Sequence, residues 1–428
     1  MQLWDSDTTS EDDSLGYGVT DNSGFFSIGP VSNVDEFKPN RQDVYVVALA
    51  RNDAAEVRPT YDGNSCRFQG PPHSNVASGV FDTSLTLTAA QSGAFFVADA
   101  LQEAWNRWTQ LRPGNQPYRV NVEWRANYEQ THYNDAMDYI HIEAGTQVGW
   151  AWPDTFDRDV IRHEYCHRLE HEFGFFDEGR GDHFWDSLVN PRVAATEGAA
   201  TALAAVLQAY PGAMRYNTFN DFVDSFWVNL ENGQYGYYGS RDTIYNSGNN
   251  YGRTCEAAVA GILWDIFDSN NDDFSTMTLP VRPNPYQPDG VGDTLSDGAQ
   301  HILQVVLDRY VNGQRPDSID AFKVAWLQNP SLGHKNAMTD IWYEHGIDCC
   351  TGTTGDANMS GMVDLGDLTY LVGYLTNGAA LPCHSEGNVN AVGIVDAGDL
   401  SALLAYFDGN YTLPPCPPAP MRPIGGGR

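Results

Sequence analysis

Residues 163 to 167 read His-Glu-Tyr-Cys-His. In an α-helix, residues four apart lie on the same face, so His163 and His167 can bind one metal ion together. Glu164, one position further round, can then reach a water molecule on that metal. Two imidazoles and a carboxylate at this spacing are what hydrolytic zinc chemistry requires, and we predict a zinc hydrolase site here.

The surrounding residues predict that this motif lies on a helix. Residues 154–159 contain one threonine and three aspartates, which favour a helix start just before the motif. Ile161, Tyr165 and Leu169 recur at every fourth position and should pack against the protein, leaving the histidines on a different face. Cys166 points away from that face, so we interpret it as a packing residue. The alternative is a solvated helix with incidental histidines.

A catalytic zinc normally has three protein ligands, so the motif needs a third. Residues 193–210 are apolar or small nearly all round and predict a buried helix, in which Glu197 is the only charged residue. A buried carboxylate is costly unless it is paired or metal-bound, and Gly198 beside it permits close approach. We therefore predict Glu197 as the third ligand, with a buried salt bridge or helix-end charge as the alternative. Other ligands could come from the intervening segment: Asp177, Glu178, Asp182, His183 and Asp186.

These residues resemble a known family. The zinc motif followed by Thr-Glu-Gly at 196–198 resembles the gluzincin metallopeptidases, which include the thermolysin-like and the fungalysin-like enzymes. Segments 255–268 and 320–326 are similar to helices that follow the zinc site in fungalysins, and the likeness covers roughly residues 90–345. The resemblance implies a zinc endopeptidase with Glu164 as general base. The metzincin pattern is absent, because Glu170 and Phe173 occupy its glycine and third-histidine positions.

The chain departs from the fungalysin pattern at one place. Fungalysins carry an oxyanion-stabilising histidine a few residues before the glutamate that matches Glu256. Here that place holds Tyr251 and Arg253, and either could substitute, because a phenol or a cation can stabilise a developing oxyanion. Both could equally be structural hydrogen bonders. His345 is a further candidate, and its alternative is an ordinary surface or capping residue.

A second pattern lies near the C-terminus. Side-chain oxygens at calcium-loop positions 1, 3, 5, 9 and 12, with a backbone carbonyl at position 7, are supplied by Asp356, Asn358, Ser360, Asp364, Asp367 and Met362. The pattern recurs 32 residues later as Asn388, Asn390, Ile394, Asp396 and Asp399. The second copy has asparagine at position 1 and Val392 at position 5, so we expect it to bind calcium weakly or not at all.

Each loop precedes a helical segment, and this duplicated unit resembles a type I dockerin. The resemblance implies a cohesin-like protein partner. The partner-binding positions hold Leu365-Gly366 and Ala397-Gly398 rather than hydroxylated residues, and a calcium-stabilised tail without a partner is the alternative. Four cysteines around the loops suggest two disulfides of open connectivity: Cys349, Cys350, Cys383 and Cys416.

The composition indicates where such a protein works. The net charge of −32, with three lysines in 428 residues, argues against nucleic acid or anionic membranes as partners. No apolar run is long enough to span a membrane. We predict a secreted protein from the cysteine cluster, the calcium loops and the peptidase motif, and we expect its export signal to lie outside this chain. The other three cysteines leave at least one thiol free or paired between chains.

The remaining segments predict a multidomain chain. Short β-prone runs at 25–28, 44–49, 57–60 and 85–87 indicate an N-terminal β-sandwich similar to transthyretin-like or carboxypeptidase-regulatory-like domains. Its acids could bind calcium or line a solvated loop: Asp5, Asp7, Asp12 and Asp13. A helix at 94–111 and strands at 118–124 and 139–142 predict an α+β peptidase core. The expected layout is 1–90 sandwich, 91–346 zincin-type metallopeptidase, 347–416 small α dockerin-like domain and 417–428 tail.

Two functions follow from these patterns. The first is a secreted zinc-dependent endopeptidase that acts on proteins or peptides, with Zn²⁺ and Ca²⁺ as cofactors. The second is a catalytically inactive extracellular binding or adhesion protein that retains the peptidase fold. The complete ligand set favours the first, and the missing oxyanion histidine favours the second.

Overall fold

The structure is a computed structural model. It describes residues 1–6, 12–21, 23–32, 41–126, 130–144, 154–177, 181, 183, 185, 189–208, 218–221, 226–230, 234–236, 242–243, 252–267, 298–308, 315–327, 329, 331–332, 341–342, 350, 353–358, 360, 362–377, 381, 383–392 and 395–416. The chain forms two compact units, Met1–Asn106 with Pro117–Glu164, and Arg107–Gln116 with Tyr165–Arg428.

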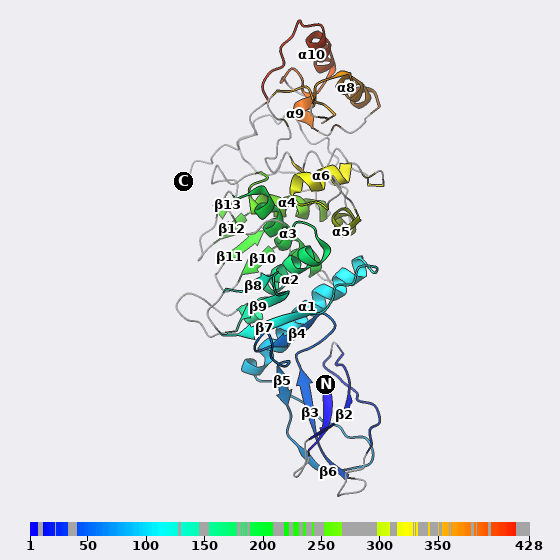
Figure 1. Cartoon of the computed structure of the whole chain (residues 1–428), viewed down its shortest axis with the longest axis vertical. Coiled ribbons are helices and arrows are strands. Elements are labelled where there is room, and N and C mark those ends of the chain that lie inside the picture. The colour runs from blue at the N-terminus through cyan, green and yellow to red at the C-terminus, as the bar shows by residue number, and fades with distance from the viewer. Residues whose placement is uncertain are drawn as a thin grey trace. The chain divides into compact units, whose positions relative to one another are not determined.

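The first unit begins with an antiparallel sheet. Its strands are β1 (Gln2–Asp5), β2 (Asp13–Tyr17), β3 (Arg41–Leu49), β5 (Arg67–Gln69) and β6 (His73–Ala77). The order is β2-β1-β3-β5, and β6 also pairs with β3 (Figure 1). The middle of β3 supplies its buried residues, because Val44, Tyr45, Val46 and Val47 are each less than 5% exposed.

The first unit contains a second sheet. It contains β4 (Ala55–Arg58), β7 (Val120–Arg125), β9 (Tyr139–Glu143) and β8 (His132–Asn134), in the order β4-β7-β9-β8. The first three strands are parallel, and β8 runs antiparallel to β9. In the described part of the chain, β8 is an edge strand of this sheet.

The strands differ from the predicted sandwich. The expected run at 57–60 only overlaps β4, which does not join the first sheet but pairs with β7, where Ala55 and Val57 are fully buried. Segments 25–28 and 85–87 form no strand, and the first contributes only the isolated bridge Thr20–Phe26. The described residues therefore form one N-terminal sheet rather than two packed ones.

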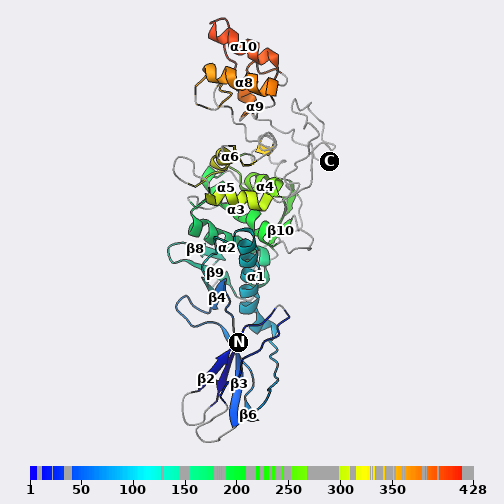
Figure 2. The same ribbon diagram turned by 90° about the vertical axis from the view of Figure 1, so that its right-hand side faces the viewer.

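Helix α1 (Ala89–Leu111) runs alongside the second sheet (Figure 2). The helix was expected at 94–111, and one face of it is buried, since Val97, Leu101, Ala104 and Trp108 have no exposed surface. Gly93 allows a close approach: a Cβ there would lie 2.7 Å from Cζ2 of Trp124 on β7. A larger residue at this position would push the helix away from the sheet.

The second unit is mainly helical. After α2 (Arg158–Phe173) come α3 (Pro191–Leu207), α4 (Glu256–Phe267), α5 (Gly298–Asp308) and α6 (Ile319–Leu327). Four short strands form an antiparallel sheet in sequence order: β10 (Thr218–Asp221), β11 (Phe226–Asn229), β12 (Gln234–Gly236) and β13 (Asp242–Thr243). The mixture of sheets and helices agrees with the predicted mixed α and β class.

Helices α3 and α4 pack closely at Gly198. A Cβ at this position would lie 2.6 Å from the carbonyl oxygen of Glu256 and 2.7 Å from Cβ of Val259. Only a residue without a side chain allows the two backbones to come this close. The contact holds two buried glutamates, Glu197 and Glu256, on facing helices.

The C-terminal residues build a small module around α8 (Leu365–Asn377), α9 (His384–Gly387) and α10 (Ala397–Phe407) (Figure 1). Its buried core includes Leu371 and Leu403, one from each predicted loop-helix unit. A disulfide joins Cys350 to Cys416 across 66 residues, and Cys383 is also disulfide-bonded. Cys349 lies outside the described residues.

Among the described residues, no disulfide involves Cys66, Cys166 or Cys255, and the last two are buried. Burial raises the pKa of Cys66 to about 11. No helix among the described residues is long and apolar enough to cross a membrane.

Candidate metal centre

The zinc motif lies on α2 (Arg158–Phe173), as predicted. The 3-10 turn η1 (Asp154–Phe156) precedes this helix, and the Asp157 carboxylate accepts the backbone N–H groups of Asp159 and Val160 at 3.1 and 3.3 Å. Asp157 therefore satisfies two amides that the first turn leaves unpaired. The predicted packing residues Ile161, Tyr165 and Leu169 have no exposed surface, and Cys166 is buried with them.

Helix α3 brings Glu197 to the two histidines. Asn190 caps the helix by accepting the N–H of Arg192 at 2.9 Å, and Pro191 occupies the first turn, where its missing N–H costs nothing. The hydroxyl of Thr196 donates a hydrogen bond to the carbonyl of Phe176. This bond ties the helix to the segment that follows α2 and fixes the neighbouring Glu197, which is 7% exposed.

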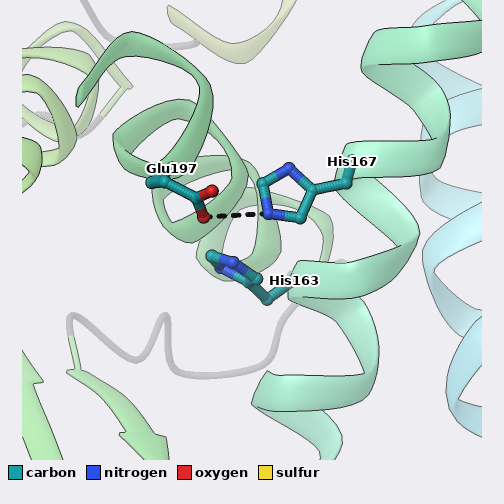
Figure 3. Close-up of side chains that lie close together, drawn as sticks. All are labelled: His163, His167 and Glu197. Carbon is teal, nitrogen blue, oxygen red and sulfur yellow. Dashed lines mark hydrogen bonds and ion pairs between the residues drawn. The ribbon is translucent and has the colours of Figure 1, made fainter. Parts of the chain in front are cut away.

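Three possible ligand atoms converge at this point. The donor atoms of His163, His167 and Glu197 all lie within 4.8 Å of one another, and Nε2 of His167 lies 3.0 Å from Oε2 of Glu197 (Figure 3). Two imidazole nitrogens and one carboxylate oxygen fit Zn²⁺, which binds such donors in a four-coordinate site. Three protein donors leave one position for water or substrate.

The carboxylate of Glu164 is held by the edge strand β8. The backbone N–H of Tyr133 donates to Oε2 of Glu164 at 2.7 Å, and the side chain of Glu164 is buried. The Glu164 carboxylate is therefore fixed next to His163. The sequence motif identifies Glu164, but it gives no indication of the Tyr133 amide.

His167 has a second carboxylate partner. Its Nδ1 lies 2.9 Å from Oε2 of Glu170, one turn further along α2. Glu170 has no exposed surface; this burial raises its pKa, and the hydrogen bond and charge of His167 oppose that rise. Sequence reasoning assigned Glu170 no role, although its spacing of three residues from His167 places it on the same helix face.

His183, an alternative ligand in the sequence analysis, lies beside Glu197. Its Nε2 is 3.4 Å from Oε2 of Glu197, and its Nδ1 is 2.9 Å from Oε2 of the buried Glu256. Burial opposes the charged imidazole, but the hydrogen bond and charge of Glu256, together with the charge of Glu197, raise the pKa of His183 to about 9. Within the described residues, His183 does not join the compact group of three donor atoms.

The other predicted site residues divide into two groups. Asp177 pairs with His171 at 2.9 Å, and Nε of Arg253 pairs with Asp320 of α6 at 2.8 Å. The remaining candidates lie outside the described residues: Glu178, Asp182, Asp186, Tyr251 and His345.

The two C-terminal loops have the same backbone hydrogen bonds. In the first, Asp367 accepts the N–H groups of Asn358 and Asp364 at 2.9 and 2.7 Å. In the second, Asp399 accepts those of Asn390 and Asp396 at 3.0 and 2.8 Å. The matching residues of the two loops therefore make matching hydrogen bonds.

The loops differ at position 5. The N–H of Ser360 donates to Asp356 at 2.8 Å, and that of Val392 donates to Asn388 at 3.1 Å. Ser360 adds a hydroxyl oxygen to the first loop, whereas Val392 supplies none. Ile394 lies outside the described residues, and the hydroxyl of Ser360 donates to the carbonyl of Met362 at 3.1 Å.

Comparisons with known proteins add little. No family model matches the sequence, and no curated protein matches it. Among solved structures, the chain is similar to a precursor of protealysin, a metalloproteinase from Serratia proteamaculans. The TM-score is 0.40 and the sequence identity 11%, over 70% of this chain and 89% of that chain.

Proposed function

We propose that this chain is a zinc-dependent endopeptidase. The observation that carries the proposal is the convergence of the donor atoms of His163, His167 and Glu197 within 4.8 Å, next to the buried carboxylate of Glu164. These residues would hold the metal. When bound, zinc would make water a stronger nucleophile and polarise the scissile carbonyl.

The residues of the chain then perform the proton transfers. Glu164 would take a proton from the attacking water and deliver it to the leaving amine, which makes it both general base and general acid. The backbone N–H of Tyr133 donates to Oε2 of Glu164 at 2.7 Å and so fixes the Glu164 carboxylate, which need not be reoriented during the reaction.

Digestion of a mixture of proteome-derived peptides tests this proposal. The same experiment shows which residues the enzyme prefers on either side of the cleaved bond. We expect incubation with the full chain to produce new peptide termini, identified by mass spectrometry, with a recurring residue next to the cleaved bond. Their absence at every enzyme concentration would contradict a peptidase function.

His183 is the side chain that we expect to contact the substrate beside the metal ligands. Its imidazole is about one-third exposed and is oriented by Glu256, whereas Arg253 is paired with Asp320. His183→Ala should keep zinc and lower kcat by about 10²–10³-fold, the usual effect of losing one group that stabilises a developing oxyanion. Steady-state kinetics and zinc analysis of both His183→Ala and Arg253→Ala check this. A larger loss of kcat in Arg253→Ala would favour the assignment made from sequence.

We further propose that the first C-terminal loop binds Ca²⁺ and that the second binds it weakly. The support is the ligand set, since the first loop has an extra charge at position 1 and a side-chain oxygen at position 5. Calcium should protect residues 354–412 from added protease. Asp356→Ala or Asp367→Ala should remove most of that protection and Asn388→Ala little, as measured by fragment analysis after limited digestion. Equal effects in the two loops would show that they bind calcium alike.

Secretion and a protein partner belong to the same proposal. The Cys350–Cys416 disulfide supports an oxidising compartment, because such bonds are rare where glutathione keeps thiols reduced. A cohesin-like partner for the C-terminal module stays a prediction.

A further inference from the structure

The imidazole of His167 is held between two carboxylates. Nε2 lies 3.0 Å from Oε2 of Glu197, and Nδ1 lies 2.9 Å from Oε2 of Glu170. Glu197 and His167 belong to the proposed metal site. Glu170 is not close enough to join the donor group, yet it contacts the one ring nitrogen of His167 that faces away from that group.

Burying the carboxylate of Glu170 at this position costs folding free energy. The residue has no exposed surface, and among the described residues its Oε1 has no hydrogen-bond partner. A buried carboxylate with one oxygen unpaired is unfavourable for folding. It also lies near the C-terminal end of α2, where the helix dipole disfavours negative charge. Helix stability therefore does not account for a glutamate at this position.

The contact with His167 explains why a glutamate lies at position 170. A neutral imidazole carries its proton on one nitrogen and a lone pair on the other, and the hydrogen bond of one nitrogen decides which. A carboxylate at Nδ1 holds the proton there. Nε2 then presents its lone pair toward Glu197, where a metal would be bound. The negative charge also makes the imidazole a stronger ligand.

We propose that Glu170 is a positioning residue that fixes the tautomer of His167 and strengthens its bond to the metal. The inference rests on the proposed zinc site, but it concerns metal affinity and not the reaction. A purely structural Glu170 would affect the stability of the fold and leave metal affinity unchanged, so the two roles can be separated.

Two substitutions test the proposal in the full chain. Glu170→Leu removes the acceptor and replaces it with apolar volume, and we expect zinc affinity to fall about 10–100-fold, the usual effect of losing such a partner. Glu170→Gln keeps a carbonyl that can accept from Nδ1 but removes the charge, and its loss should be smaller. Zinc affinity is measured by competition with a chromophoric chelator, and the visible spectrum of the Co²⁺-loaded protein reports the ligand geometry.

Glu172→Gln is the matched control. Glu172 lies on the same helix and forms an ion pair with Arg168, so the same charge is lost near the site. Its zinc affinity and cobalt spectrum should equal those of the unmodified chain. If one Glu170 variant fails to fold, as judged by circular dichroism, the other carries the test.

Three results would overturn the inference. Folded Glu170 variants could bind zinc as tightly as the unmodified chain and give the same cobalt spectrum. The control could lose as much affinity as Glu170→Leu, which would indicate a general charge effect. Finally, an unmodified chain that binds no zinc would overturn the metal site itself, whereas a chain that binds zinc without cleaving peptides would leave the role of Glu170 standing.

Discussion

Glu164→Gln should abolish peptide hydrolysis while the fold and the zinc content stay unchanged. Glutamine keeps the shape of the side chain, and its carbonyl can still accept the Tyr133 amide. It cannot take a proton from water, so kcat should fall by about 10²–10⁴-fold as general-base catalysis is lost. Steady-state hydrolysis of a fluorogenic peptide, with zinc measured on the same sample, checks this expectation.

The result would be decisive in either direction. Retention of more than about a tenth of the activity would show that Glu164 is not the general base, because loss of such a base usually lowers the rate about 10²–10⁴-fold. Loss of zinc together with activity would instead show that Glu164 is needed to build the site.

Glu197→Ala should lose zinc as well as activity. The carboxylate is one of three possible ligand atoms within 4.8 Å, and two histidines from one helix alone are a poor zinc site. Glu197→Gln tests the same point without a cavity. It preserves packing between α3 and α4 but removes the charge, so a structural Glu197 would tolerate the change and a ligand would not.

The controls for this prediction are Asp177→Ala and His183→Ala. Asp177 pairs with His171, and His183 lies outside the compact donor group, so both variants should keep zinc near one per chain. Elemental analysis of folded protein gives the content. If Glu197→Ala keeps its full zinc content and His183→Ala loses zinc, then His183 is the third ligand. The gluzincin assignment would then be wrong.

The parts of the site that sequence predicted are those encoded by local spacing. Two histidines four residues apart must share a helix face, whatever the rest of the fold does. Glu197 was predicted because a single charge in an otherwise apolar helix needs a reason to be buried, and α3 is indeed buried along nearly its whole length. The repeated calcium-loop spacing likewise gave two loops with matching hydrogen bonds.

The parts that sequence missed depend on contacts between distant segments. The bond from Tyr133 to Glu164 spans 31 residues, and that from His183 to Glu256 spans 73. Neither pair has a spacing that a local pattern could reveal. The N-terminal sandwich was predicted from β-prone runs alone, which indicate strands but not their partners, and β4 pairs with β7 far along the chain.

Hydrolysis of unstructured casein by the full chain tests the central claim most directly, with new amino termini counted before metal removal, after treatment with a zinc chelator, and after stoichiometric zinc is restored. We predict that new termini form, stop forming on chelation and form again with zinc. A chain that retains one bound zinc and releases no new termini would contradict the account, and would indicate a binding protein that keeps the metal site without its chemistry.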